Sequence, residues 1–545
     1  MPVYVAEEFT EAEEQILRRY VTNLDLPVFA LVNLPEVVKG ALFARYSRSP
    51  KSLRRLFLDE FIGDLDMSGD VTFDATVGLR RAEELYEKVF FEYGDDSVAQ
   101  LGGVHLACEQ ASNVLTKLLE WGRLMSYLEQ STRYLGYDNR LPSGHYRYYR
   151  APEILESPLG ARYIGEMDRM FDCYAELLPQ VTQWLSTRYP KEAGDSDFVY
   201  RQAIRAKALD AVRGLLPAAS LSNVGIYGTG QAYEMLLLRL RAHPLPEARS
   251  YADLMLEELR KVIPSFLRRV DVAERGGEWS QYFESTRSAT ARVLERIWPD
   301  ALNPAVSAEV EAPEVRLVEF DPDGELRILT EIAVATTRLS EAAARSRVER
   351  MSEDEKAELF TAYIGNRTNR RHRPGRAFEA TSYRFEFVTD YGAFRDLQRH
   401  RMLTIDWQPL TTALGYDVPA IIEESGLSSK YLESLDRSAA LADALEPDFP
   451  EQTPYAVALA YRIRYVMEMN AREAMHLIEL RSGAQGHPSY RRVAQQMHNL
   501  LATHAGHHHV ARAMTFVDHG ATDLERLESE RRAEARRRAM SADLN

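Results

Sequence analysis

The sequence is poor in cysteine, and this scarcity excludes two classes of protein. Its 545 residues include two cysteines, Cys108 and Cys173. Two thiols are too few for a disulfide framework or a cysteine-rich zinc site, and they fit a reducing compartment. The sequence also lacks an uncharged apolar run of about 18 residues, and it starts with neither a basic nor an apolar segment. We therefore expect a cytoplasmic protein that is neither secreted nor embedded in a membrane.

Excess positive charge and the common nucleotide-binding fingerprints are absent too. The 67 Lys and Arg residues are outnumbered by 82 Asp and Glu residues, which gives a net charge of −15. Such an acidic chain is not expected to bind nucleic acid through broad counterion release. No Gly-x-Gly-x-x-Gly or P-loop motif stands between a predicted strand and helix, which excludes a Rossmann site and a nucleoside triphosphatase of that type.

A repeat divides the chain into two halves. The tetrapeptide Leu-Gly-Tyr-Asp at 135–138 recurs at 414–417, an offset of 279 residues. Upstream, the segment at 121–123, Trp-Gly-Arg, corresponds to Arg-His-Arg at 399–401 with an offset of 278. Two copies of one fold are therefore expected.

The stretch 302–326, a Pro- and Ala-rich run followed by a predicted strand and a turn, separates the copies. We place a domain boundary there, so that 1–304 forms the first half and 305–545 the second. Length and composition, with 45% hydrophobic residues, agree with globular domains.

Hydrophobic periodicity predicts an α+β fold, in which each half has a small, mostly antiparallel sheet flanked by long helices. The apolar residues between 107 and 119 have helical spacing, whereas those between 382 and 387 alternate as in a half-buried strand. The pattern at 315–320 also predicts a strand. Further helices are expected at 200–214, 231–242, 251–263, 338–360, 390–401, 455–482 and 489–516.

The first candidate site is the hexapeptide at 129–134, which contains Glu129, Ser131 and Arg133. Its carboxylate and hydroxyl can bond to a nucleobase or sugar, while a guanidinium can bind phosphate through two parallel hydrogen bonds. A polar helix cap would use the same residue types, and the hexapeptide alone favours that interpretation.

The second candidate is Arg399-His400-Arg401. Two guanidiniums beside an imidazole can bind a phosphate or an electron-rich ring, although the tripeptide taken alone favours a solvated basic turn. The same tripeptide occurs at 371–373, but only the later copy keeps register with the repeat.

The third candidate is one helical face that carries Asn470, Arg472 and His476, with Arg481 farther along its polar edge. A solvated polar face is the alternative. The histidine-rich tail, by contrast, lacks the HExxH pattern of a zinc site, so we expect no metal there. Its members are His498, His504, His507, His508 and His509. Cys108 is expected in the core, and 530–538 in a solvated charged helix.

Taken in chain order, these segments resemble the flavin-dependent thymidylate synthase family. The family signature is Arg-His-Arg, seven further residues and Ser, within a pattern that ends Glu-x-Ser-x-Arg-Tyr. The first half matches the end of this signature at 129–134, but Trp121 and Gly122 replace its first two residues. The second half matches the opening at 399–401, but Pro409 stands in place of the serine.

The segment at 470–481 is similar to the family's C-terminal helix, whose Asn and first Arg hold flavin and whose later Arg contacts the nucleotide. In the first half we expect its counterpart at 228–239, with Gly228 and Gly230 in place of Asn and the first Arg. Arg213 resembles a family arginine that contacts the nucleotide phosphate, whereas the second half has Pro454 near that point.

The losses in the two halves are complementary, and the resemblance implies a division of labour between two thymidylate-synthase-complementing-type domains. Ser131 and Arg481 are the expected catalytic residues. The resemblance assigns the nucleotide to Glu129, Ser131, Arg133 and Arg213 of the first half together with Arg481. It assigns the flavin to Arg399, His400, Arg401, Asn470, Arg472 and His476 of the second half. Because family members are homotetramers, a homodimer that forms a pseudo-tetramer is expected.

The implied activity is reductive methylation of dUMP to dTMP. FAD would be the cofactor, with methylenetetrahydrofolate and NADPH as co-substrates and with neither nucleic acid nor membrane as a partner. The departures at 121, 122 and 409 leave open the flavin-dependent modification of another pyrimidine, and also a non-catalytic paralogue that binds flavin or nucleotide. A zinc protein built on the histidine-rich tail is a more distant alternative.

Overall fold

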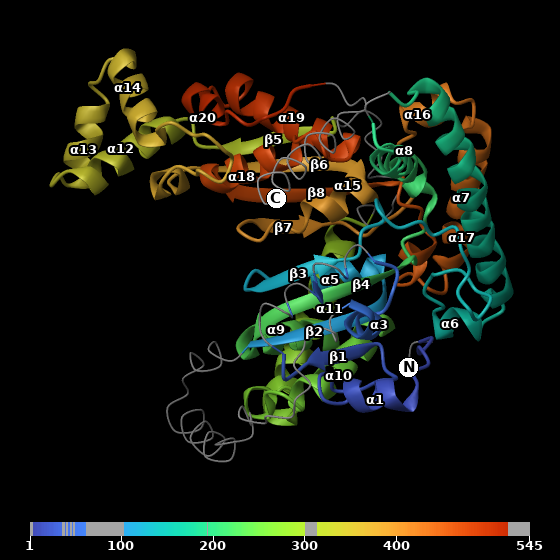
Figure 1. Cartoon of the computed structure of the whole chain (residues 1–545). Coiled ribbons are helices and arrows are strands. Elements are labelled where there is room, and N and C mark those ends of the chain that lie inside the picture. The colour runs from blue at the N-terminus through green and yellow to red at the C-terminus, as the bar shows by residue number, and fades with distance from the viewer. Residues whose placement is uncertain are drawn as a thin grey trace, which may run out of the picture. The chain divides into compact units, whose positions relative to one another are not determined.

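The structure is a computed structural model. It describes residues 4–34, 39, 42, 43, 46, 49–60, 103–192, 195–299 and 313–520. The described residues form two four-stranded sheets, one from each half of the sequence (Figure 1). The first has the order β1 (Val28–Leu31), β2 (Gly103–Ser112), β4 (Leu221–Thr229) and β3 (Met125–Glu129). The second has the same order, with β5 (Val315–Phe320), β6 (Ser382–Asp390), β8 (Arg462–Asn470) and β7 (Thr404–Trp407).

Every pairing within these sheets is antiparallel, and the predicted α+β fold with two similar copies is confirmed. The described helices of the first half are α1 (Glu11–Leu17), α3 (Leu53–Glu60), α5 (Asn113–Leu119), α6 (Pro152–Leu155), α7 (Gly160–Arg188), α8 (Asp197–Val212), α9 (Gly230–Arg241), α10 (Pro246–Arg260) and α11 (Glu278–Ile297). Those of the second half are α12 (Gly324–Thr336), α13 (Glu341–Val348), α14 (Glu353–Ile364), α15 (Tyr391–Leu397), α16 (Ala420–Glu424), α17 (Ser428–Leu445), α18 (Ala471–Arg481), α19 (Pro488–Thr503) and α20 (His508–Ala513).

The chain folds into two compact units that do not follow the two halves of the sequence. Unit 1 contains Met1–Leu178, Leu215–Ser307 and Leu427–Ala458, and unit 2 contains the remaining residues. Helix α8 of the first half therefore belongs to the unit with the second sheet, and α17 of the second half belongs to the unit with the first. The boundary expected between 304 and 305 lies outside the described residues, so the division at that point stays a prediction.

The two central strands, β2 and β6, differ by one residue. Gly103 pairs with Thr229 and Ser112 with Leu221, which spans ten residues of β2 against nine of β4. In the second sheet, β6 and β8 pair nine residues with nine, without a shift of register. The extra residue of β2 forms a bulge between Cys108 and Ala111.

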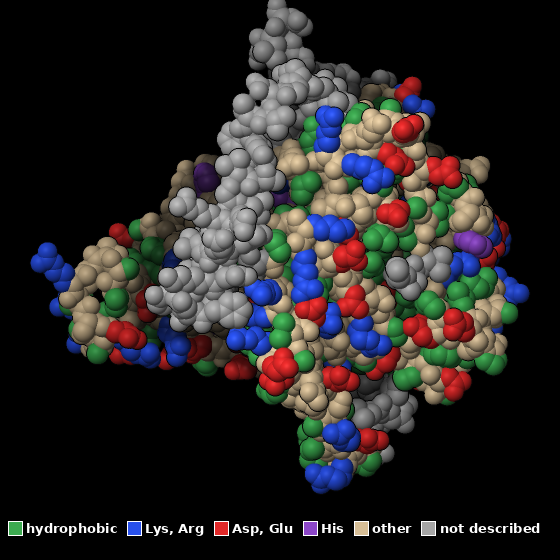
Figure 2. Space-filling model, turned by 90° about the horizontal axis from the view of Figure 1, so that it is seen from below, with side chains coloured by type: hydrophobic (Ala, Val, Ile, Leu, Met, Phe, Trp, Pro, Cys, Tyr) green, Lys and Arg blue, Asp and Glu red, His purple; other side chains and the backbone are tan. Residues whose placement is uncertain are grey.

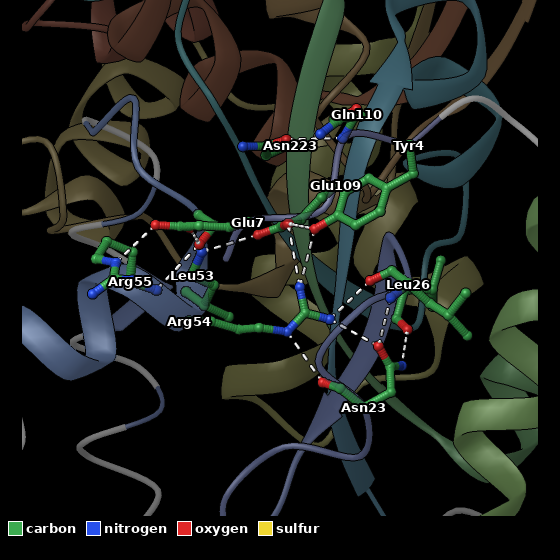
Figure 3. Close-up of polar contacts among 12 residues, drawn as sticks. Tyr4, Glu7, Asn23, Leu26, Leu53, Arg54, Arg55, Glu109, Gln110 and Asn223 are labelled. Carbon is green, nitrogen blue, oxygen red and sulfur yellow. Dashed lines mark hydrogen bonds and ion pairs between the residues drawn. The ribbon is translucent and has the colours of Figure 1, made fainter. Parts of the chain in front are cut away.

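The bulge presents Glu109 to the N-terminal part of unit 1 (Figure 3). Its buried carboxylate accepts hydrogen bonds from the hydroxyls of Tyr4 at 3.0 Å and Tyr46 at 3.1 Å. It also accepts one from the backbone N–H of Leu53 at 2.9 Å, and Arg54 Nη1 lies 3.7 Å away. One buried charge thereby joins helix α3 and the N-terminal segment to the sheet.

A reciprocal exchange of side chains relates the ends of the two central strands. Ser112 caps α5 and Asp390 caps α15, each by accepting a hydrogen bond from the backbone three residues later. Glu247, the second residue of α10, accepts from the Ser112 hydroxyl at 2.6 Å. At the matching place in the second half, the hydroxyl of Ser489 donates to Asp390. Both halves therefore have a hydrogen bond between a hydroxyl and a carboxylate at this place. In the first half the strand end supplies the hydroxyl and the helix the carboxylate, whereas in the second half the strand end supplies the carboxylate and the helix the hydroxyl.

The helix predicted over 107–119 is wrong in its first part, because β2 extends to Ser112 and α5 begins only at Asn113. Most of this strand is buried, so apolar residues follow one another and mimic helical spacing. The helix predicted at 455–482 is also wrong in its first part, because β8 runs to Asn470 and α18 begins only at Ala471.

Two other predicted helices are each broken in two. The one at 338–360 becomes α13 and α14, because Ser352 starts a new helix with a capping box. The one at 489–516 becomes α19 and α20, with Gly506 at a φ of 72° between them. The helix predicted at 390–401 ends at Leu397, whereas the strands at 315–320 and 382–387 are confirmed. The segment 530–538 lies outside the described residues.

Cys108 is fully buried, as predicted. No described helix combines the length and the apolar character that crossing a bilayer requires. On the face shown in Figure 2, Lys and Arg side chains are interspersed with Asp and Glu, so neither sign of charge gathers over a wide area there.

Candidate functional site

A polar cluster in unit 2 is centred on His400, which follows α15 and has 4% of its side chain exposed. Arg481 Nε, at the end of α18, donates to His400 Nε2 at 3.0 Å. Because Nε2 accepts this bond, Nδ1 carries the proton and donates to Glu473 Oε1 at 3.1 Å. Burial, followed by the charges of neighbouring arginines, holds the pKa of His400 well below its usual value. The imidazole is therefore neutral and fixed in one tautomer at pH 7.

Helix α18 supplies the other members of this cluster. Asn470 caps the helix, and its side-chain oxygen accepts from the backbone N–H of Glu473 at 2.9 Å. Burial raises the pKa of Glu473 to about 7. Burial and the nearby Arg373 lower the pKa of His476 to about 4, and the two imidazole rings lie 5.4 Å apart. Around neutral pH the cluster therefore holds two neutral imidazoles and a carboxyl group near its titration midpoint.

Guanidinium groups surround the cluster. Arg472 Nε donates to the carbonyl of Pro374 at 3.0 Å, and Arg472 Nη1 lies 3.4 Å from Glu379. Arg399 pairs with Asp396 on α15, and Arg401 is exposed. Unit 2 therefore gathers the second-half residues that the sequence singled out, namely Arg399, His400, Arg401, Asn470, Arg472, His476 and Arg481.

Arg213 belongs to the same unit, although it comes from the first half of the sequence. It ends α8, with 4% of its side chain exposed. Its Nη1 lies 3.3 Å from Asp396 Oδ2, and its Nη2 lies 3.7 Å from Asp390 Oδ1. The sequence placed Arg213 with the nucleotide residues of the first half, whereas in the structure it contacts carboxylates of the second half.

The other first-half candidates lie in unit 1, at the end of β3 and directly after it. Glu129 is buried against Lys117, with 3.3 Å between Oε2 and Nζ. Ser131 Oγ accepts from the backbone N–H of Arg133 at 3.3 Å, and Arg133 is 8% exposed. The hexapeptide is therefore an ordered turn and not a helix cap, with its first residue used in a buried ion pair.

The first-half counterpart of α18 is α9, but the predicted alignment between them is wrong by one residue. Thr229 caps α9 as Asn470 caps α18. Gln231 therefore occupies the position of Arg472, and Thr229, not Gly228, replaces the asparagine. At the positions of His476 and Arg481 the first half has Met235 and Leu240, so α9 has lost the charged and imidazole groups of α18.

Three residues of the unit 2 cluster escaped the sequence reasoning: Arg373, Glu473 and Asp396. Arg373 belongs to the tripeptide that was set aside because it breaks the register of the repeat, yet its Nη2 lies 2.9 Å from His476 Nδ1. Glu473 follows Arg472 directly, and its position between Asn470 and His476 on the same helix was the available signal.

The histidine-rich tail makes ordinary structural contacts. His507 Nδ1 lies 2.7 Å from the Tyr383 hydroxyl, and His498 Nε2 lies 3.0 Å from the carbonyl of Ala511. Among the described residues, the group able to hold a metal is instead His400, Glu473 and His476, whose ligand atoms lie within 4.8 Å of one another. Because Arg481 and Arg373 bond to imidazole nitrogens of this group, a cation there would face two guanidiniums, and we do not propose a metal site.

Comparison with known proteins places these features in a family. The family described as "Thymidylate synthase complementing protein" matches residues 47–265 and 316–505. A "UPF0159 protein" of Chlamydia pneumoniae is 38% identical over 533 residues, which cover 97% of this chain and 98% of that protein. Another, from Thermoplasma acidophilum, is 33% identical over 519 residues, which cover 90% and 97%.

A solved UMP/dUMP methylase, PolB from Streptomyces cacaoi bound with 5-Br dUMP, is 17% identical and matches 37% of this chain and 93% of its own, with a TM-score of 0.29. This structural similarity is too weak to support an inference about the fold or the function of this chain. The family match, by contrast, covers both halves and most of the chain. The chain therefore belongs to the thymidylate synthase complementing protein family, the flavin-dependent thymidylate synthases, as a tandem member with two copies of the family domain.

Proposed function

We propose that the chain is an FAD-dependent thymidylate synthase that converts dUMP to dTMP. Methylenetetrahydrofolate would supply the one-carbon unit, and NADPH and a proton would be consumed, with tetrahydrofolate and NADP⁺ as the other products. When bound, FAD would supply the redox chemistry by passing a hydride from NADPH to the nucleotide. The family match supports a thymidylate synthase-like enzyme, and the choice of cofactors and co-substrates is our proposal.

The observation that carries the proposal is the shared carboxylate of Asp396. Arg213, which resembles the phosphate-binding arginine of the family, and Arg399, which resembles its flavin-binding arginine, both pair with Asp396. One unit thus holds a nucleotide-side residue of the first half and a flavin-side residue of the second. This supports a composite site whose parts the two degenerate copies share, because separate decay of the copies would not bring the retained residues together.

The side chains of unit 2 fit a flavin dinucleotide. A diphosphate requires cationic donors, and Arg399, Arg401 and Arg472 supply them. The pKa values of His400 and His476 are lowered partly by neighbouring arginines, which indicates a positive potential suited to an anion. Because Asn470 Oδ1 caps α18, its role toward the flavin would fall to the amide Nδ2.

In this proposal the protein acts mainly by positioning and by electrostatics. Arg213 and Arg133 would bind the dUMP phosphate, and Glu129 and Ser131 would lie beside the nucleotide. Arg481 would polarise the uracil ring, with its orientation fixed by the bond to His400. The neutral His400 and His476 would hold the flavin together with Asn470 and Arg472.

The visible absorption spectrum of the purified protein tests the proposal. We expect a bound oxidised flavin whose spectrum shifts when dUMP is added, followed by dTMP formation once methylenetetrahydrofolate and NADPH are supplied. Arg213→Gln should abolish the dUMP-induced shift, whereas Arg347→Gln, a change of an exposed arginine on α13, should not. A protein that binds no flavin under any condition would contradict the proposal.

The position of Pro409 favours a second candidate function, the modification of a different pyrimidine nucleotide. Pro409 stands where the family has a serine beside the nucleotide, and proline has neither a hydroxyl nor a backbone N–H to donate. Product analysis with dUMP and UMP as competing substrates separates the two candidates.

A further inference from the structure

Residues 367–373, Arg-Thr-Asn-Arg-Arg-His-Arg, contain four arginines and a histidine within seven positions. We call this segment the arginine loop. It lies in unit 2 between α14 and β6, and neither the family signature nor the roles assigned above use it.

A buried ion pair anchors the loop to helix α18. Arg367 Nη1 and Nη2 lie 2.7 Å and 2.6 Å from the two oxygens of Glu479, and both side chains are nearly inaccessible, at 2% and 1% exposed. Nη1 also donates to the carbonyl of Ala513 at 2.6 Å. Two parallel bonds to one carboxylate fix the guanidinium in orientation as well as in place.

Local hydrogen bonds then shape the rest of the loop. The backbone N–H of Arg371 donates to Asn369 Oδ1 at 2.9 Å, and the N–H of His372 donates to the carbonyl of Asn369 at 3.0 Å. Arg367 Nε donates to the carbonyl of His372 at 2.5 Å. The loop is therefore an ordered turn, in which the backbone positions of its remaining arginines are fixed.

The loop also reaches the flavin-side residues of α18. Arg373 Nη2 lies 2.9 Å from His476 Nδ1, and Arg472 Nε donates to the carbonyl of Pro374 immediately after the loop. Of the residues that the resemblance assigned to the flavin, His476 thus contacts the loop and Arg472 contacts the residue that follows it.

Three of the four arginines of the loop form no ion pair with the described residues. Arg370, Arg371 and Arg373 are exposed, and within the part of the chain that the structure describes none of them lies within 4.0 Å of a carboxylate. Clustered cations repel one another even where water screens them, and a bound anion would relieve this repulsion. Of the neighbouring carboxyl groups, Glu479 binds Arg367, and Glu379 binds Arg376 and Arg472. Glu473 bonds to His400, and the charge of Arg373 opposes the rise of the Glu473 pKa that burial causes.

We propose that the arginine loop binds phosphate groups of a dinucleotide, with Arg371 and Arg373 as its principal contacts. The inference rests on the proposed function for the identity of the ligand, because either FAD or NADPH offers phosphates of this chemistry. Guanidinium groups suit a diphosphate because each can donate two parallel hydrogen bonds to phosphate oxygens. The loop would thus contribute to the affinity for a dinucleotide and make this affinity depend on its phosphate groups.

The test compares the double variant Arg371→Gln/Arg373→Gln with Arg347→Gln, which removes the same charge from an exposed arginine on α13. The first probe is inorganic pyrophosphate. We expect it to raise the melting temperature of the wild type and of Arg347→Gln but not that of the double variant. Both exposed residues can be changed without removing the Arg367 anchor, and circular dichroism checks that the double variant is folded.

The second probe set distinguishes the two sources of phosphate. If the loop binds FAD, the double variant should lose at least about tenfold in affinity for FAD and keep its affinity for riboflavin. If it binds NADPH instead, FAD affinity should persist and the affinity for NADPH should fall by at least about tenfold. Unchanged affinity for pyrophosphate, FAD and NADPH would overturn the proposal. A wild type that binds no flavin but is stabilised by pyrophosphate through the loop would overturn the proposed function and leave the anion site standing.

Discussion

Arg213 and Arg399 pair with opposite oxygens of one carboxylate, Asp396, although 186 residues separate them in the sequence. Arg213 comes from the half that kept the nucleotide-side residues, and Arg399 comes from the half that kept the flavin-side residues. A displacement of one guanidinium would therefore shift the Asp396 carboxylate, and with it the position of the other guanidinium. The family signature does not include Asp396. The two ligands of the proposed reaction are expected to be coupled through Asp396.

Asp396→Asn is the variant that tests this coupling. Replacing the carboxylate by an amide removes the charge that orients both guanidiniums, and we expect the affinities for dUMP and for FAD each to fall by about tenfold. Separate fluorescence titrations with each ligand measure the two effects. Asp323→Asn, which removes a more exposed carboxylate paired with Arg345, is the matched control. Loss of one affinity without the other would show that Asp396 does not couple the two ligands.

Glu247 is expected to make the stability of unit 1 fall as the pH rises. Burial raises its pKa from 4.5 to about 7, so between these values the carboxyl ionises in the unfolded chain but stays protonated in the folded one. The unfolded state then binds fewer protons, and Glu247 removes on the order of 2 kcal/mol of stability across this window. Urea unfolding of unit 1 at pH 5 and pH 8 should show a smaller difference for Glu247→Gln than for the wild type. Equal differences would mean that Glu247 ionises alike in both states.

The parts of the structure that follow local rules were predictable from the sequence. The alternation of Tyr383, Phe385 and Phe387 predicted β6, because one face of that segment is buried and the other is less so. The tripeptide at 399–401 and the polar face of α18 were recognised because the same helix and turn carry all of their functional groups. These predictions required only information from residues close together in the sequence.

The remaining features depend on contacts between distant segments. No local pattern could reveal that α8 packs in the unit of the second sheet, and so the contact of Arg213 with Asp396 was not foreseen. The bulge at Glu109 shifts the strand by one residue, and burial of both faces of β2 hid its period of two. Arg373 was set aside because its tripeptide is out of register with the repeat. Its contact with His476 depends on how the chain folds, which the register of the repeat does not reveal.

Arg481→Ala should lower turnover by at least about a hundredfold while leaving dUMP affinity nearly unchanged, if Arg481 acts on the uracil ring mainly in the transition state. The variant also removes the positive charge beside the neutral His400. Burial and then Arg481 lower the pKa of His400, so this pKa should rise part of the way toward its ordinary value. Nuclear magnetic resonance of labelled histidine reports this second effect without any need for activity. Arg481→Lys should keep much of the charge effect but lose the geometry of the Nε bond. Unchanged turnover in Arg481→Ala would exclude the role.

The chain is expected to bind one flavin, and not two, although it contains two copies of the fold. At the position of His400 the first half has Gly122, where a Cβ atom would lie 2.6 Å from the Tyr127 hydroxyl, so Tyr127 fills the space that an imidazole would need. We therefore expect a ratio of one flavin per chain when flavin released by heat is measured by absorbance against protein concentration. The single variant His400→Ala should then abolish nearly all flavin binding. A ratio of two, or retention of half of the flavin in His400→Ala, would mean that the first half has kept a flavin site of its own.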